Sequence, residues 1–87
     1  MNQFCKSVIA FLQSEYSDGY NFSITVYQEL SGIKAIELIV KIDTSYTVKI
    51  GNTTMQYLFN LYCQGDYIAE RKQWLWQKEL IDILEGG

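Results

Sequence analysis

The sequence predicts an α+β fold in which three helices pack on one face of a three-stranded antiparallel sheet, in the order α-β-β-β-α-α. The spacing of apolar residues supports this fold, because they recur every three or four positions near both ends of the chain and every second position in the middle. Short connections between the predicted strands indicate an antiparallel meander. We therefore expect a single domain over residues 1–87, with 85–87 as a frayed tail.

A helix is predicted for the N-terminal segment. Its apolar residues follow the i, i+3, i+4 spacing of one helix face: Phe4, Cys5, Val8, Ile9, Leu12 and Tyr16. The residues Ser17, Asp18 and Gly19 form a breaker that ends this helix.

Three strands are predicted between Tyr20 and Ile50. Their inward-facing residues are, in chain order, Phe22, Ile24 and Val26; then Ile36, Leu38, Val40 and Ile42; then Tyr46, Val48 and Ile50. Turn residues separate the strands at 31–32 and 43–45, and Gly51 with Asn52 ends the third.

Two helices are predicted to complete the chain. Thr53 or Thr54 can cap the first of them, and Gly65 is placed to end it in a left-handed conformation. Its apolar face consists of Met55, Leu58, Phe59 and Tyr62. The last helix is predicted over 66–84, directly after Gly65, with Asp66 as its cap.

The composition excludes several classes of function. The chain has 48% hydrophobic residues, which is typical of a globular domain, and a net charge of −3, which argues against nucleic-acid binding through phosphate contacts. No apolar run approaches the roughly 18 residues that span a bilayer, and no secretory pattern opens the chain, so we expect a cytoplasmic protein without membrane contact. Cys5 and Cys63 are expected to be buried free thiols, with a disulfide or a reactive cysteine as alternatives.

Residues for catalysis are scarce. Histidine is absent, which removes the commonest general base and metal ligand, and no glycine-rich phosphate-binding motif is present. Pairs of carboxylates such as Glu79 with Asp82 occur at ordinary surface spacing. We therefore expect no enzymatic activity, metal or cofactor.

The first five elements also match the order of a double-stranded RNA-binding domain. Such a domain needs lysines at the start of its second helix to bridge phosphates. Here the corresponding segment 53–58 carries no positive charge. This alternative is therefore not favoured.

The predicted last helix carries apolar residues on two faces. One face holds Ile68, Leu75, Trp76, Leu80 and Ile83. Tyr67, Trp74 and Ile81, spaced by seven, lie on the opposite face near Arg71 and Lys78. Aromatic residues beside long cationic side chains are typical of protein interfaces. This second face is predicted to bind a partner protein; the alternatives are a satellite core beneath another helix and a homodimer interface about a two-fold axis.

Three features resemble a known family: the element order, the run 36–42 (IELIVKI), and the run 57–62 (YLFNLY) followed by Gln64 and Gly65. Together they resemble the small type II-A anti-CRISPR proteins of Firmicute phages. The resemblance implies a stoichiometric inhibitor, acting in the host cytoplasm, that masks the DNA-recognition surface of the Cas9 nuclease. It further implies that Asp43 in the strand turn, and Asp66 with Glu70 at the corner before the last helix, contact basic side chains of the partner, while Tyr67 and Trp74 anchor the contact.

Overall fold

The computed structural model describes residues 2–16, 19–28, 34–42 and 46–86. The elements, in chain order, are α1 (Asn2–Glu15), β1 (Tyr20–Gln28), β2 (Lys34–Ile42), β3 (Tyr46–Ile50), α2 (Asn52–Gln64), β4 (Tyr67–Ile68), β5 (Gln73–Trp74) and α3 (Leu75–Gly86). The predicted α+β class and the order of three helices and three sheet strands are confirmed. None of the described helices is long and apolar enough to cross a membrane.

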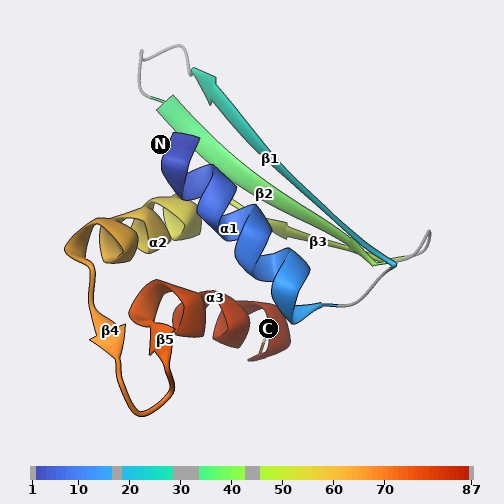
Figure 1. Cartoon of the computed structure of the whole chain (residues 1–87). Coiled ribbons are helices and arrows are strands. Elements are labelled where there is room, and N and C mark those ends of the chain that lie inside the picture. Colours follow the sequence, from blue (N-terminus) through green and yellow to red (C-terminus); the bar gives the residue numbers. More distant parts are fainter. Residues whose placement is uncertain (1, 17–18, 29–33, 43–45, 87) are drawn as a thin grey trace.

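The three long strands form an antiparallel sheet in the order β1-β2-β3. The even-numbered residues of 22–26, 36–40 and 48–50 share the inner face, since Phe22 pairs with Val40 and Val40 with Val48. All three helices lie on this face, as Figure 1 shows. The opposite face of the sheet carries polar side chains, including an ion pair between Lys49 and Glu37 with Nζ and Oε2 3.1 Å apart.

The core fills the space between the sheet and the helices. Its fully buried large side chains are Phe4, Val8, Leu12, Ile36, Leu38, Met55, Leu58 and Leu80. They come from α1, β2, α2 and α3. The apolar residues of the helices at both ends of the chain and those of the central strand therefore pack into one apolar cluster.

The junction between β3 and α2 depends on a side chain rather than on a predicted cap. Gly51 is the residue before the helix, and no side chain caps the helix there, so the predicted capping role of Thr53 or Thr54 is wrong. Asn52 instead accepts a hydrogen bond on its Oδ1 from the backbone N–H of Ile36, at 2.9 Å. At the other end of α2, Gly65 adopts the predicted left-handed conformation, with φ 70°, and donates to the carbonyl of Leu61.

The predicted helix over 66–84 is wrong in its first half. Residues 67–74 form the two-stranded β4–β5 hairpin, and α3 begins only at Leu75. The hairpin projects from the ends of α2 and α3, away from the main sheet (Figure 1).

The two cysteines differ in environment. Both are free thiols, as expected. Cys5 is half-buried beside the core, and burial raises the pKa of its thiol. Cys63 is exposed on α2, so the expectation that both thiols are buried is wrong for Cys63.

Candidate functional site

The β4–β5 hairpin is closed at both ends by backbone hydrogen bonds. At its base, the N–H of Leu75 donates to the carbonyl of Asp66 at 2.8 Å. At its tip, Arg71 donates to Ile68 at 3.1 Å and Lys72 to Ala69 at 3.2 Å. Lys72 has a left-handed backbone with φ 53°, a conformation that usually favours glycine. These bonds fix the orientation of the two short strands.

Tyr67 and Trp74 form an exposed aromatic pair on this hairpin. They are direct partners in the strand register, and their rings meet edge to face with centroids 4.9 Å apart. Tyr67 is 51% exposed and Trp74 is 41% exposed. Edge-to-face packing holds each ring in place, so the pair presents apolar surface that is already ordered.

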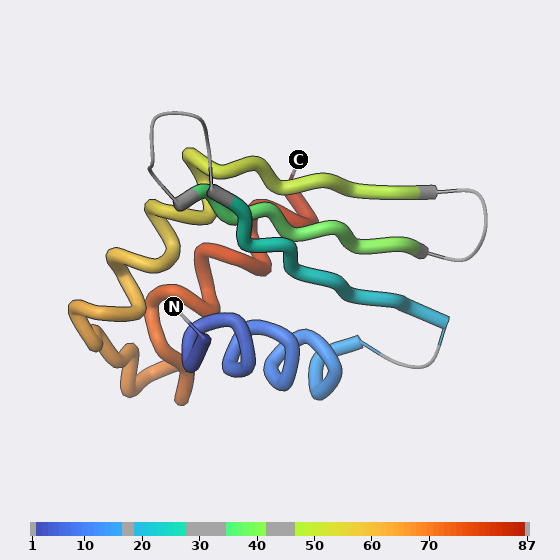
Figure 2. Tube along the Cα trace, turned by 90° about the horizontal axis from the view of Figure 1, so that it is seen from above, coloured from blue at the N-terminus to red at the C-terminus, as the bar shows by residue number. Residues whose placement is uncertain are grey.

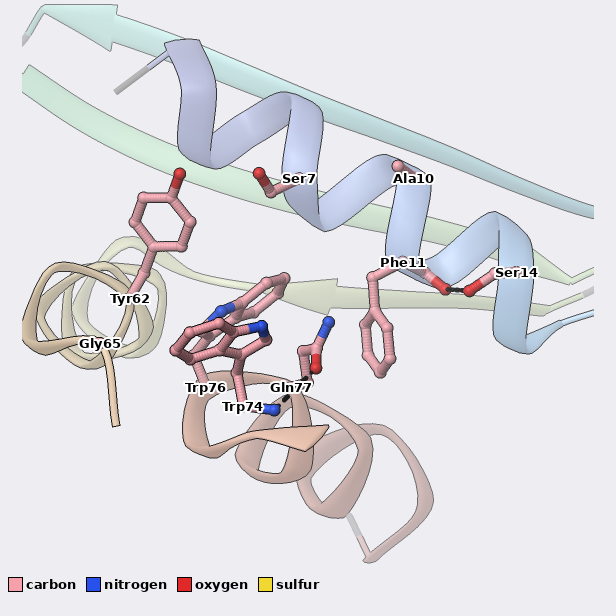
Figure 3. Close-up of a pocket in the computed structure, with 9 residues that line it drawn as sticks. All are labelled: Ser7, Ala10, Phe11, Ser14, Tyr62, Gly65, Trp74, Trp76 and Gln77. Carbon is pink, nitrogen blue, oxygen red and sulfur yellow. Dashed lines mark hydrogen bonds between the residues drawn. The ribbon is translucent and has the colours of Figure 1, made fainter. Parts of the chain in front are cut away.

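A groove of about 570 Å³ lies beside this pair, between α1 and the start of α3. We call it the aromatic groove. Its aromatic lining consists of Phe11, Tyr62, Trp74 and Trp76, and its polar lining includes Ser7, Ser14 and Gln77 (Figure 3). The volume is within the usual range of small-ligand and side-chain pockets.

The inner wall of the aromatic groove consists of aromatic rings in mutual contact. Trp76 is only 5% exposed, and its ring contacts both Phe11 and Tyr62 edge to face, with centroids 5.7 Å apart in each pair. Phe4 packs against Tyr62 and Trp76 from the core side. A wall of interlocked aromatic rings loses little conformational entropy when a ligand packs on it.

The polar groups of the groove are largely occupied by the protein itself. The hydroxyls of Ser7 and Ser14 donate to the carbonyls of Gln3 and Phe11 within α1, at 2.8 and 2.7 Å. Gln77 accepts the backbone N–H of Trp74 on its Oε1 at 2.8 Å, which caps the start of α3. Its amide nitrogen remains available as a donor at the groove, and none of the described residues that line the groove is charged.

The structure brings together only part of the predicted site. Tyr67 and Trp74 are neighbours, through strand pairing and not through a shared helix face. Ile81 does not join them, because it lies on α3, half-buried against the core. The predicted surface of Tyr67, Trp74 and Ile81 on one helix is therefore wrong.

The two predicted acidic residues that the structure describes lie at opposite ends of the hairpin. Asp66 lies at the base of the hairpin and Glu70 in the turn at its tip, both exposed. Asp43 lies outside the described residues. Lys78, predicted near the helix face of Tyr67, Trp74 and Ile81, pairs with Asp82 on α3 with Nζ and Oδ2 2.6 Å apart, and this carboxylate raises the pKa of the Lys78 ammonium.

The sequence interpretation missed the groove residues Phe11, Tyr62 and Gln77. The sequence pattern places Tyr62 on the apolar face of its helix and does not include Phe11 in the face of the first helix. The approach of both residues to Trp76 is a tertiary contact without a local signal. Gln77 did carry a signal, because a glutamine three residues after a possible helix start is typical of a capping position. That signal pointed to a helix beginning at Leu75.

The described lining of the aromatic groove offers aromatic rings and the Gln77 amide as a hydrogen-bond donor. Among the described residues, no group of three or more His, Cys, Asp or Glu side chains could hold a metal ion. No protein-family model, curated protein or solved structure matches the chain.

Proposed function

We propose that this chain is a non-enzymatic protein-binding module that recognises its partner through the Tyr67–Trp74 pair and the adjoining aromatic groove. The observation that carries the proposal is the exposure of two large aromatic rings, fixed edge to face, at the mouth of an uncharged groove. Tyrosine and tryptophan are enriched among the residues that dominate binding energy, particularly beside pockets from which water is excluded.

The partner fits a simple chemical description. An apolar side chain of the partner would pack between Trp74 and the Trp76 wall, and a carbonyl oxygen beside it would accept from the Gln77 amide. Asp66 and Glu70 flank the aromatic pair along the hairpin, where exposed carboxylates favour encounter with a basic surface. These carboxylates affect the specificity and the rate of association more than they affect the affinity.

Within this proposal, we infer that the partner is a host defence nuclease and that the chain acts as an inhibitor encoded by a phage or mobile element. Support comes from the resemblance to type II-A anti-CRISPR proteins in element order, length and the runs 36–42 and 57–62. The direct test is DNA cleavage by a purified type II-A Cas9–guide complex with and without the protein in equimolar amount. Unchanged cleavage and no complex on gel filtration would reject this partner while leaving the binding surface itself open to the next test.

Site-specific photo-crosslinking tests the surface without assuming the partner. A benzophenone amino acid replaces Tyr67 in one variant and Tyr57 in a control, because Tyr57 is 50% exposed but lies on α2 away from the hairpin. We expect one discrete crosslinked species in the native host from position 67, absent from position 57 and lost when Trp74→Ala is added. Equal crosslinking at both positions would contradict the proposal.

Light scattering distinguishes a foreign partner from a second copy. We expect the purified protein to have the mass of one 10.1 kDa chain. A mass twice as large that Trp74→Glu halves would assign the aromatic pair to a homodimer interface instead.

A further inference from the structure

The outer edge of β1 lacks the features that usually protect a sheet edge. β1 is nine residues long, contains no charged residue and no proline, and pairs with β2 in an uninterrupted register. β3, the other edge, is shorter, with five residues, and carries Lys49. Edge strands are normally blocked by lysine, proline, bulges or short length, because their unpaired N–H and C=O groups otherwise recruit another strand.

Apolar surface accompanies this open edge. Val26 faces the inner side of the sheet, as its pairing with Ile36 requires, yet it is 40% exposed. Phe22 and Ile24, on the same face, are only half-buried. The inward-facing residues of a central strand are covered by the strands on either side of it. Those of β1 are partly exposed, as expected of a strand that has a neighbour on one side only.

A groove runs below this edge. It has a volume of about 540 Å³ and lies between β1 and α1, lined on the strand side by Phe22 and Ile24 and on the helix side by Cys5, Lys6 and Ile9. Figure 2 shows β1 as the outermost strand of the sheet, with α1 running alongside it. The inward side chains of an added strand would enter this groove.

We propose that the edge of β1 and the flank of α1 together dock an extended segment of a partner protein, which adds a fourth strand to the sheet. The outward N–H and C=O groups of β1 set the chemistry of the occupant, because only an extended backbone can pair with them in series. Within the described part of the chain, no segment occupies that edge. This site and the aromatic groove share Ala10 of α1 in their linings but are otherwise formed by different residues, and the proposal does not depend on the aromatic groove.

The surroundings define the segment more closely. Alternate residues facing the groove are apolar and of medium size, to cover Ile24 and Ile9. Lys6 is the one charged residue among the described residues of the groove lining, so an acidic side chain near it completes the match. A second copy is not the expected occupant. Pairing through β1 would bring the α1 helices of both copies to the same face of the joined sheet, beside the same two strands, where there is room for the side chains of one added strand only.

The test uses a synthetic peptide of alternating valine and threonine, N-methylated on every second residue. This modification leaves one hydrogen-bonding edge for β1 and prevents self-association of the peptide. We expect binding to slow amide exchange in β1 by about tenfold or more, while amides of β3 are unaffected. A control peptide N-methylated on every residue has neither edge and should not bind.

Two further comparisons test the groove. Ile24→Lys places a charge in the groove and should weaken peptide binding by about tenfold or more, whereas Thr25→Lys adds the same charge to the opposite face and should change it by less than about twofold. Replacing the peptide valine that lies nearest to Lys6 by aspartate should improve binding, and Lys6→Glu should reverse that preference. If Ile24→Lys loses its cooperative unfolding transition, Ile9→Lys on the α1 wall replaces it.

Several results would overturn the inference. They are equal binding of the fully N-methylated peptide, no detectable binding of the probe, binding without protection of β1 amides, and equal effects of the Ile24 and Thr25 substitutions. A wild-type dimer that Ile24→Lys converts to a monomer would also overturn it, by assigning the edge to a second copy. Loss of function by Trp74→Ala affects only the aromatic groove, so failure of either site can be told from failure of the other.

Discussion

The Asn52 carboxamide takes the place of a backbone carbonyl where β3 ends. β3 stops at Ile50, which pairs with Leu38, so Ile36 on the central strand has no β3 partner. Asn52 Oδ1 accepts the Ile36 N–H and also a hydrogen bond from Gln56 Nε2 at 3.2 Å. Ile36 is fully buried, so its N–H has no access to water in place of this contact.

Removing this acceptor should destabilise the folded protein. We expect Asn52→Ala to lower the free energy of unfolding by about 1–3 kcal/mol, because it leaves a buried N–H unsatisfied. Asn52→Asp keeps an acceptor oxygen and places negative charge in the first turn of α2, so it should stay within about 1 kcal/mol of wild type. Urea titrations followed by circular dichroism measure both. A loss in the aspartate variant as large as in the alanine variant would show that the hydrogen bond is not the cause.

This contact illustrates why residue-level roles were only partly predictable. The sequence placed turn and cap residues at the β3–α2 junction, and Gly65 ends α2 as predicted because its left-handed role depends on local conformation. The role of Asn52 depends on Ile36, which lies 16 residues earlier in the chain. No local pattern specifies such a partner.

At the scale of elements, the long strands and the first two helices followed from periodicity, and the C-terminal segment did not. In segment 66–74 the apolar spacing fits a helix. The hairpin turn contains no glycine, proline or asparagine, which are the residues that usually indicate a turn in a sequence. Lys72 takes the left-handed position that glycine would normally mark. Tyr67 and Trp74 were still predicted on one surface, because seven residues bring side chains together on a helix and this hairpin also pairs these two positions.

The aromatic pair should contribute to the stability of the hairpin. A double-mutant cycle with Tyr67→Ala, Trp74→Ala and the double variant should give a coupling energy of about 0.5–1.5 kcal/mol, as expected for edge-to-face rings. Thermal or urea unfolding of the four proteins measures it. As a control, the same cycle between Tyr57 and Trp74 should give a coupling near zero, since these residues belong to different surfaces. Additive effects of Tyr67 and Trp74 would mean that their contact does not order the pair.

At the scale of the whole molecule, Tyr16 joins the two ends of the fold. It follows α1, its ring lies 5.0 Å from that of Tyr20 and 6.1 Å from that of Phe22, and the carboxylate of Glu85 near the end of α3 is close to it. Its hydroxyl is buried without a well-formed hydrogen bond to any described residue. Burial, and then the negative charge of Glu85, raise the pKa of the Tyr16 phenol.

This shift predicts a loss of stability in alkali. The unfolded chain releases the Tyr16 proton near its ordinary pKa of 10.0, whereas the folded chain holds it to higher pH. The contribution of Tyr16 to the free energy of unfolding is therefore fully present below pH 10, and it is lost as the pH rises through the pKa of Tyr16 in the folded chain. We expect Tyr16→Phe to unfold with a shallower dependence on pH between about 9 and 12 than wild type. Tyr57→Phe, which removes an exposed phenol, is the control; identical slopes for wild type and Tyr16→Phe would contradict the assignment.

The position of the β4–β5 hairpin separates the proposed binding surface from the packed core. All four residues of its tip, 69–72, are exposed, whereas Trp76 and Leu80 on the adjoining helix are buried. Substitutions at the tip can therefore accumulate without disturbing the packing of α3 against the sheet. If the proposed surface binds a partner, exchange of these tip residues changes its specificity at little thermodynamic expense.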